Sequence, residues 1–223
     1  MENTCIKPLK GPDRVRKRVG SNGTNGVLNA IKMLLDIFSN EARIGKCSGI
    51  DFTIHADNSI SIHSHDRGII IDEAIVDGKP AWHNVFCELF STATNSNDKF
   101  QYPLEQENNR SLYAEDEQTP SNKITDDYGF KLCCVQYASE FMNVDVVRDS
   151  TKKSLVFKEG YSVGELQVQK TDEKSGTHIH FMPDSKVFGE NIDLTNEAFA
   201  KLLANIKHEY PALECNFIDK RIS

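Results

Sequence analysis

Two pairs of histidines have the spacing of a shared binding site. His63 and His65, like His178 and His180, are separated by one residue, which places both side chains of a pair on one face of a strand. Imidazole binds transition metals and titrates near neutral pH. One interpretation is therefore a metal or pH-responsive site that draws on His63, His178 and His180. The alternative, which we favour, is that these are surface-strand histidines with no shared role.

The cysteines favour a reduced protein. The sequence contains six, none of them in a C-x-x-C pair, and two of them are adjacent: Cys5, Cys47, Cys87, Cys133, Cys134 and Cys215. This spacing matches neither a disulfide framework nor a zinc site. We expect reduced, partly buried thiols.

Composition and charge are those of an ordinary globular protein. Of the 223 residues, 39% are hydrophobic and 26% are charged, and the net charge is −7. Direct DNA binding is not expected, because phosphate neutralisation needs an excess of clustered Lys and Arg. The one basic cluster is interpreted as a solvated helix face: Arg14, Arg16, Lys17 and Arg18.

Membrane and export signals are missing from the sequence pattern. No apolar run has the length of a membrane span, and the N-terminal stretch MENTCIKPLKGPDRVRKR is too polar for a signal peptide. We therefore expect a cytoplasmic protein with no membrane contact.

The apolar pattern predicts the elements that position these residues. The strongest helix is predicted for residues 27–45, because apolar residues from Val27 to Phe38 recur every three or four positions and Gly45 supplies a stop. Before it we expect a loose arm (1–9), a short basic helix opening at Pro12, and a flexible loop at 20–26. A β-hairpin (50–54 and 59–64) follows, then a turn at 77–80 and a helix at 81–93.

The second half of the chain begins with a long polar segment. Residues 94–127 contain few apolar positions, which is typical of a lid, a functional loop or disorder. A helix (128–140), four strands (142–148, 153–159, 165–170 and 177–182), a helix (194–208, capped by Thr195 or Asn196) and a closing strand (213–218) are predicted after it. The order predicts an α+β fold in one domain spanning 1–223: a two-layer sandwich of a mixed, mostly antiparallel sheet with helices on one face.

Several short motifs follow the order found in one protein family. They are Arg14-x-Arg16-Lys17-Arg18 (family V-R-K-R-P), Leu35-Asp36-x4-Glu41-Ala42-x2-Gly45 (V-D-N-x3-E-A-x2-G), Asp57-Asn58-Ser59-Ile60 with Arg67-Gly68-Ile69 (D-N-S-I and R-G-I-P), Gly78-Lys79-Pro80-Ala81, Asp98-Lys99-Phe100, and residues 174–184. The ordered set resembles the N-terminal ATPase domain of gyrase B and topoisomerase IV B, which are components of bacterial type II topoisomerases and belong to the GHKL (Bergerat-fold) superfamily. The resemblance covers nearly the whole chain, and no transducer, TOPRIM or DNA-gate domain is expected within it.

The resemblance implies where ATP would be hydrolysed and which groups have changed. The family uses a carboxylate to align water and an amide side chain to hold Mg²⁺. On the alignment set by Asp36, Glu41 and Gly45, the base position is Met33 and the Mg²⁺ position is Ile37. A thioether activates no water and a sec-butyl group binds no cation, so the resemblance implies no catalytic residue and no metal here.

The nucleotide-reading positions are altered as well. The family's adenine-reading aspartate corresponds to Ser64, and the glycine that follows it corresponds to Asp66. The phosphate-cradling glycine run falls on residues 126–131, where Gly129 is the glycine that remains. The two aspartates that precede Tyr128 would repel a polyphosphate.

Other pocket positions match the family: Asp36, Glu41, Arg67, Gly68, Ile69, Lys99, Arg148 and Thr177. In the family the Glu41 and Arg67 positions flank the adenine pocket. One explanation is that these residues stabilise the fold alone. The other is that a site for a small ligand or a modified nucleotide is retained.

Two functions from different classes follow from the resemblance. The first is a degenerate, non-hydrolysing domain with no cofactor, which acts as a binding or regulatory module towards a protein partner such as a topoisomerase subunit. The alternative is an ATP- and Mg²⁺-dependent topoisomerase domain that uses substitute residues such as Asp36 or Glu41. A relic that folds but binds little is a third option. The family's dimer-wrapping arm is not matched after Val19, so at most a weak homodimer is expected.

Overall fold

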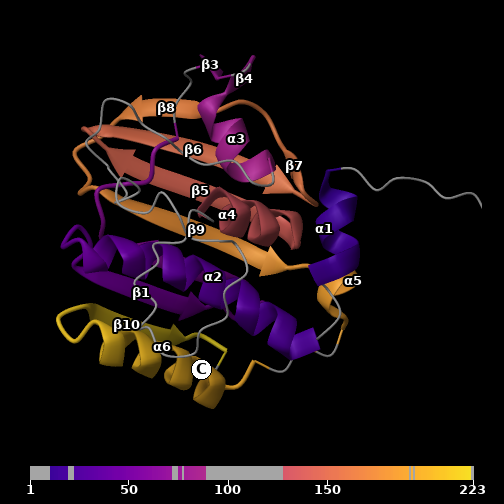
Figure 1. Cartoon of the computed structure of the whole chain (residues 1–223), viewed down its shortest axis with the longest axis vertical. Helices are drawn as coiled ribbons and strands as arrows, with labels where there is room; N and C mark the ends of the chain where they lie inside the picture. The colour runs from indigo at the N-terminus through magenta and orange to yellow at the C-terminus, as the bar shows by residue number, and fades with distance from the viewer. Residues whose placement is uncertain are drawn as a thin grey trace, which may run out of the picture.

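Helices cover one face of a large sheet in the computed structural model, which describes residues 11–19, 23–71, 75–76, 78–88, 128–190, 192 and 194–221 (Figure 1). Within these residues eight strands form one sheet in the order β10-β1-β2-β9-β5-β6-β7, with β8 also beside β6. The pair β1–β10 is parallel and the other pairs are antiparallel. This confirms the predicted α+β fold with a mixed, mostly antiparallel sheet.

The strands of the sheet are β1 (Gly49–Ile54), β2 (Ile60–Ser64), β5 (Ser139–Arg148), β6 (Thr151–Lys158), β7 (Tyr161–Ser162), β8 (Gln167–Lys170), β9 (Gly176–Pro183) and β10 (Glu214–Asp219). A separate two-stranded ribbon pairs β3 (Ile75–Val76) with β4 (Lys79–Pro80). The helices are α1 (Pro12–Val19), α2 (Gly23–Arg43), α3 (Ala81–Cys87), α4 (Tyr128–Tyr137), α5 (Ser185–Phe188) and α6 (Asn196–Glu209).

The two faces of the sheet differ because side chains alternate along each strand. A row of cross-strand partners faces the helices. Five of its members belong to the core and Phe217 packs against them: Phe52, Ile62, Ile179, Val144 and Leu155. One position along, the next row points to the opposite face and is polar: Asn216, Asp51, His63, His178, Asp145 and Ser154. The sheet and the helices thus form two layers, with the apolar face of the sheet under the helices and its polar face away from them.

The long helix α2 is longer at its start than predicted, and it ends at Arg43, just before the predicted stop at Gly45. It begins at Gly23, so residues 23–26 of the expected loop are helical. Polar residues and glycine are tolerated there because the first amides of a helix need no partner within it. At the other end Gly45 adopts a φ of +70°, and the amides of Gly45 and Lys46 bond the carbonyls of Ala42 and Glu41 at 2.9 and 2.8 Å. This is a Schellman stop.

Most of the other predicted elements are confirmed with shifted ends. The β1–β2 hairpin and the Thr195 cap of α6, which accepts from the Ala198 amide at 3.2 Å, are as expected. The helix predicted for 128–140 ends at Tyr137, because β5 already pairs with β9 at Ser139. The strands predicted at 142 and 165 begin at Ser139 and Gln167, and β3, β7 and α5 were not predicted. Residues 79–80 of the predicted turn form the strand β4. The arm at 1–9, the polar segment 94–127 and the end of the helix predicted for 81–93 lie outside the described residues.

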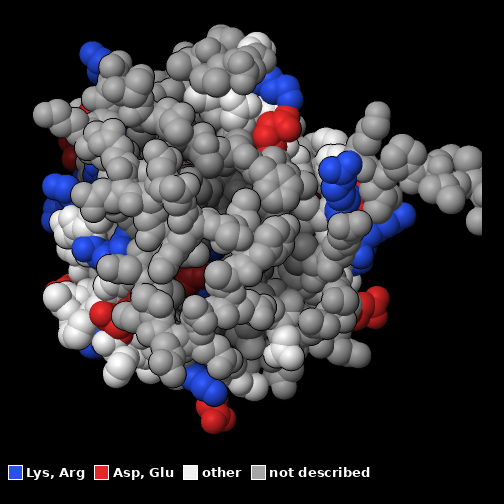
Figure 2. Space-filling view, in the orientation of Figure 1, with Lys and Arg blue, Asp and Glu red and all other residues white. Residues whose placement is uncertain are grey.

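The basic helix α1 is not wholly a solvated face. Arg14 and Lys17 are exposed, but Arg16 turns inwards, donates to the Tyr137 carbonyl at 3.0 Å and pairs with Asp184, whose side chain is 3% exposed. On the face shown in Figure 2, basic side chains of the described residues lie over α1 and also along the opposite edge, where acidic ones are interspersed with them. The absence of direct DNA binding therefore stays a prediction. Among the described residues no helix has both the length and the apolar character needed to cross a membrane.

Candidate functional site

The predicted pocket residues come from four places that meet beside α2. These are the C-terminal half of α2, the turn that follows β2, the end of β5 and the start of β9. Because β9 lies between β2 and β5 in the sheet, the turn at Asp66–Gly68 sits directly beside Thr177 and Arg148. The fold therefore brings together residues that are far apart in the sequence.

An ion pair joins α2 to this turn. The Arg67 Nε donates to Glu41 Oε2 at 3.2 Å, and the two side chains are 31% and 15% exposed. Burial raises the pKa of Glu41, while the Arg67 and Arg148 guanidinium groups oppose that rise. Arg148 also donates to the Gly68 carbonyl at 3.1 Å. The predicted frame of Glu41, Arg67 and Arg148 is thus assembled in one place.

Gly68 is at a position that only glycine can occupy. Its φ is +78°, and a Cβ atom there would lie 2.6 Å from the Val147 carbonyl oxygen. Both the backbone conformation and the close approach to β5 exclude a side chain. The turn is therefore held tightly against the end of β5, which orients the neighbouring Asp66.

Asp66 is the centre of a buried hydrogen-bond network. Its Oδ1 accepts from the Gly68 amide at 2.7 Å and from the Thr177 hydroxyl at 3.1 Å. The Thr177 Oγ1 in turn accepts from the Ile69 amide at 3.1 Å. The predicted residues Gly68, Ile69 and Thr177 therefore all act on one carboxylate.

The second carboxylate oxygen of Asp66 is buried and unpaired. Asp66 is 5% exposed, and its Oδ2 is buried without a hydrogen-bond partner in the described part of the chain. Burial raises the pKa of Asp66, and the hydrogen bond from the Gly68 amide opposes the rise. A buried acceptor is normally paired, so an orphaned one indicates a missing donor.

The adenine-reading position predicted from the sequence is Ser64, and the hydrogen-bond network of Asp66 was not predicted. Ser64 is fully buried, and its hydroxyl is 3.3 Å from the Cys47 Sγ. The sequence does show a carboxylate two residues after Ser64, next to the matched Arg67-Gly68 pair.

The other end of the site is apolar. Ile37 is 2% exposed and belongs to the main core, and Met33 packs against both that core and a smaller cluster between α1 and α4 that contains Tyr137. Neither side chain offers a ligand to a cation. The nearby carboxylate of Asp36 lies 3.5 Å from the Lys131 Nζ, so a cation is already beside it.

Of the two positions predicted to contact phosphate, one differs from the prediction and the other lies outside the described residues. Gly129 lies in the first turn of α4, which begins at Tyr128, so it is helical rather than part of an open loop. Lys99 lies outside the described residues.

The two ends of the site differ in what they offer a ligand. At one end Asp66 Oδ2 is a buried, unpaired acceptor whose companion Oδ1 is held by Gly68 and Thr177. The site offers no oxygen at Ile37 or Met33 for Mg²⁺, which binds oxygen ligands almost exclusively. The described residues therefore do not fit a magnesium–triphosphate group.

The histidines predicted to share a site divide into two groups on the open face of the sheet. His63 lies near His178, with ring centroids 5.8 Å apart, and nearer to His65, at 4.5 Å. His180 instead lies 4.8 Å from His55 and its Nε2 is 2.8 Å from Ser59 Oγ. The set of His63, His178 and His180 is thus not brought together as expected.

The described cysteines are free, as predicted. Burial raises the pKa of Cys87 to about 12 and that of Cys134 to about 11, and it also raises the pKa of Cys47 and Cys133. These thiols are therefore protonated at neutral pH and unreactive.

Comparison with known proteins matches the predicted resemblance. The chain is 29% identical over 222 residues to the type 2 topoisomerase B protein of Aquifex aeolicus, covering 98% of this chain and 25% of that protein. It is 27% identical over 219 residues to the DNA gyrase B protein of Thermotoga maritima (96% and 31%), and 28% identical over 221 residues to that of Streptococcus pyogenes (97% and 31%). The chain thus spans about a quarter to a third of the length of these curated relatives. No family model matches.

A solved structure shares the fold. The 43K ATPase domain of Thermus thermophilus gyrase B, in complex with an aminocoumarin, superposes with a TM-score of 0.72 at 23% identity, over 96% of this chain and 50% of that one. The similarity confirms the fold predicted from the sequence, a gyrase-B-type ATPase fold.

Proposed function

Because the chain is similar over nearly its whole length to the B proteins of gyrase and type 2 topoisomerase, we propose that it is a gyrase-B-like domain that does not hydrolyse ATP. It acts as a binding or regulatory module, and its partner is a topoisomerase subunit. The observation that carries this proposal is the apolar end of the site. At the family's Mg²⁺ position Ile37 is buried in the core, and at the base position the partly buried Met33 packs against it.

A second observation supports a retained small ligand. The unpaired Oδ2 of Asp66 and the surrounding frame of Thr177, Gly68 and the Glu41–Arg67 pair favour a purine or a related heterocycle with an amino group. Such a ligand needs no metal. The module would therefore bind the base without turning over a triphosphate.

Turnover and binding are measured separately to test this. We expect no Mg²⁺-dependent phosphate release from ATP above that of a Glu41→Ala variant. We also expect adenosine to raise the unfolding temperature of the unmodified chain and not that of Asp66→Ala; a ligand at a hundred times its Kd stabilises by about 2.7 kcal/mol. Mg²⁺-dependent turnover that a pocket substitution abolishes would overturn the proposal.

The regulatory part is tested with a purified gyrase. Adding the chain is expected to change the rate of ATP-dependent supercoiling, and the same amount of heat-denatured chain is the control. An unchanged rate, together with no complex in size-exclusion chromatography, would contradict a topoisomerase partner and leave a relic as the better explanation.

A further inference from the structure

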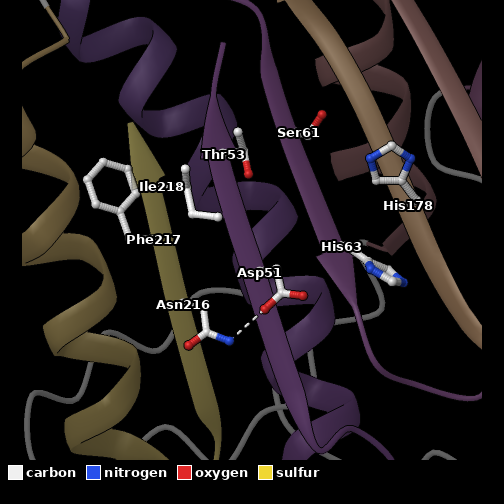
Figure 3. Close-up of a pocket in the computed structure, with 8 residues that line it drawn as sticks. All are labelled: Asp51, Thr53, Ser61, His63, His178, Asn216, Phe217 and Ile218. Atoms are coloured by element: carbon white, nitrogen blue, oxygen red, sulfur yellow. Dashed lines mark hydrogen bonds between the residues drawn. The ribbon is translucent and has the colours of Figure 1, made fainter. Parts of the chain in front are cut away.

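The open face of the sheet carries a row of polar side chains in register. Asp51 on β1 is the direct partner of His63 on β2, and His63 is the direct partner of His178 on β9. Figure 3 shows these three side chains on neighbouring strands, with Asn216 of β10 beside Asp51. They line a pocket of about 680 Å³ on the side of the sheet away from the helices.

Three of these groups converge closely enough to share one ion. Asp51, His63 and His65 each offer a ligand atom, and the three atoms lie within 4.8 Å of one another. His65 Nε2 is 2.7 Å from Asp51 Oδ2, and the His63 and His65 rings are 4.5 Å apart. A zinc ion bound at about 2.0–2.1 Å holds tetrahedral ligand atoms about 3.3 Å apart. Small side-chain rotations therefore suffice to form the site.

The surroundings leave room for both imidazole rings. A Cβ atom on Gly176 would lie 3.1 Å from His63 Nε2, and one on Gly49 would lie 3.3 Å from His65 Cδ2. Each Cβ atom would also lie close to a backbone oxygen: 2.8 Å from the Ser64 carbonyl for Gly176, and 3.2 Å from the Glu214 carbonyl for Gly49. Glycine at both places therefore allows the neighbouring backbone and the imidazole rings to approach closely.

A neighbouring residue also orients the carboxylate. Asn216 Nδ2 donates to Asp51 Oδ1 at 2.8 Å, which leaves Oδ2 directed at His65. Although burial works to raise the pKa of Asp51, hydrogen bonds from Asn216 and His65 lower it. Burial lowers the pKa of His63. Metal binding uses the ionised carboxylate and the neutral imidazole ring.

We propose that Asp51, His63 and His65 bind one divalent transition-metal ion of the zinc type, with a water molecule in the fourth position. Two imidazole nitrogens and one carboxylate oxygen suit Zn²⁺, Co²⁺ or Ni²⁺, whereas Mg²⁺ and Ca²⁺ prefer oxygen ligands alone. Asn216 is a positioning residue for the carboxylate. The site lies on the face opposite the pocket proposed for a purine, so it does not depend on that function.

The test is a Co²⁺ and Zn²⁺ titration of the full chain after removal of bound metal with a chelator. Co²⁺ should bind with a stoichiometry of one and give visible d–d bands without the near-ultraviolet band of a thiolate ligand. Zn²⁺ should displace it, and a large excess of Mg²⁺ should not. A thiolate band, or saturation only at a stoichiometry well above one, would overturn the assignment.

Variants locate the ion. His63→Ala and His65→Gln should each weaken Co²⁺ binding more than tenfold, and Asn216→Ala should weaken it about 10- to 100-fold. His208→Ala, on exposed α6, and His180→Ala, in the other histidine group, should leave the affinity unchanged. Circular dichroism checks that each variant is folded. Equal affinity of His65→Gln and the unmodified chain, or loss of binding in His180→Ala, would refute the proposed site.

Discussion

Replacing Ile37 by asparagine, the residue expected at this position in an ATP-hydrolysing relative, tests whether this part of the site is core or cavity. The side chain of Ile37 is 2% exposed and packs in the main core. Truncating a buried Ile costs about 2–5 kcal/mol, and an amide buried without partners costs about 1–3 kcal/mol more. We expect Ile37→Asn to lower the free energy of unfolding by about 3–8 kcal/mol, whereas Ile37→Val should cost about 0.5–1.5 kcal/mol.

Urea denaturation measures these differences. The chain contains one tryptophan, Trp82, which is 8% exposed and lies 6.3 Å from the Phe157 ring, so its fluorescence reports the unfolding of the core. In a water-filled nucleotide cavity the amide would be solvated, and the change would stay within about 0.5 kcal/mol. A cost below about 1 kcal/mol for Ile37→Asn would therefore refute the core assignment and favour the ATP-hydrolysing alternative.

Three further perturbations follow from contacts in the same structure. Burial raises the pKa of Asp66 above its usual 3.8, so its protonated form stabilises the fold in acid and this contribution is lost as the pH rises. Asp66→Asn does not titrate at this position. Its free energy of unfolding minus that of the unmodified chain should therefore increase from about pH 4 upwards. The Asp57→Asn variant should show the opposite slope in the same urea titrations, because hydrogen bonds from Ser59 lower the pKa of Asp57. Gly68→Ala should lower the free energy of unfolding by at least about 1–3 kcal/mol from backbone strain alone. The matched control is Gly45→Ala, because Gly45 also has a positive φ but nothing lies within 4 Å of the added Cβ. Equal losses of the two variants in thermal denaturation would contradict the close contact of Gly68 with Val147. Arg16→Ala should lower the free energy of unfolding by about 3–5 kcal/mol because it leaves Asp184 buried without its charge partner. The control Lys17→Ala, at an exposed position of the same helix, should be nearly neutral. Similar costs for the two variants would show that Arg16 is solvated.

The fold was predictable from the sequence because its signals are local and repeated. The apolar stripe of α2, the alternation along β1 and β2 and the turn between them each define an element without reference to the rest of the chain. The ends were less predictable. Where α4 stops, for example, depends on the pairing of Ser139 with Pro183 on a strand far along the sequence.

The site was predictable in its frame and not in its detail. The motif order identified Glu41, Arg67 and Thr177 as neighbours, and the structure places them together. The position of Asp66 could not be inferred, because it depends on how the turn after β2 bends towards β9. Asp51 was missed as a partner of His63, although the register of the predicted hairpin already places the two opposite each other.

The parallel pairing of β1 with β10 sets the order in which the protein can mature during translation. The paired residues Asp51 and Asn216 are 165 positions apart, so a ribosome that adds about 5–20 residues per second needs about 8–33 s to supply the partner strand. Throughout that interval one edge of β1 has open backbone groups, and the ring of Phe52 lacks its neighbour Phe217. The nascent chain is thus exposed to strand-mediated association for tens of seconds, and its yield in cells should depend on chaperones that shield this edge.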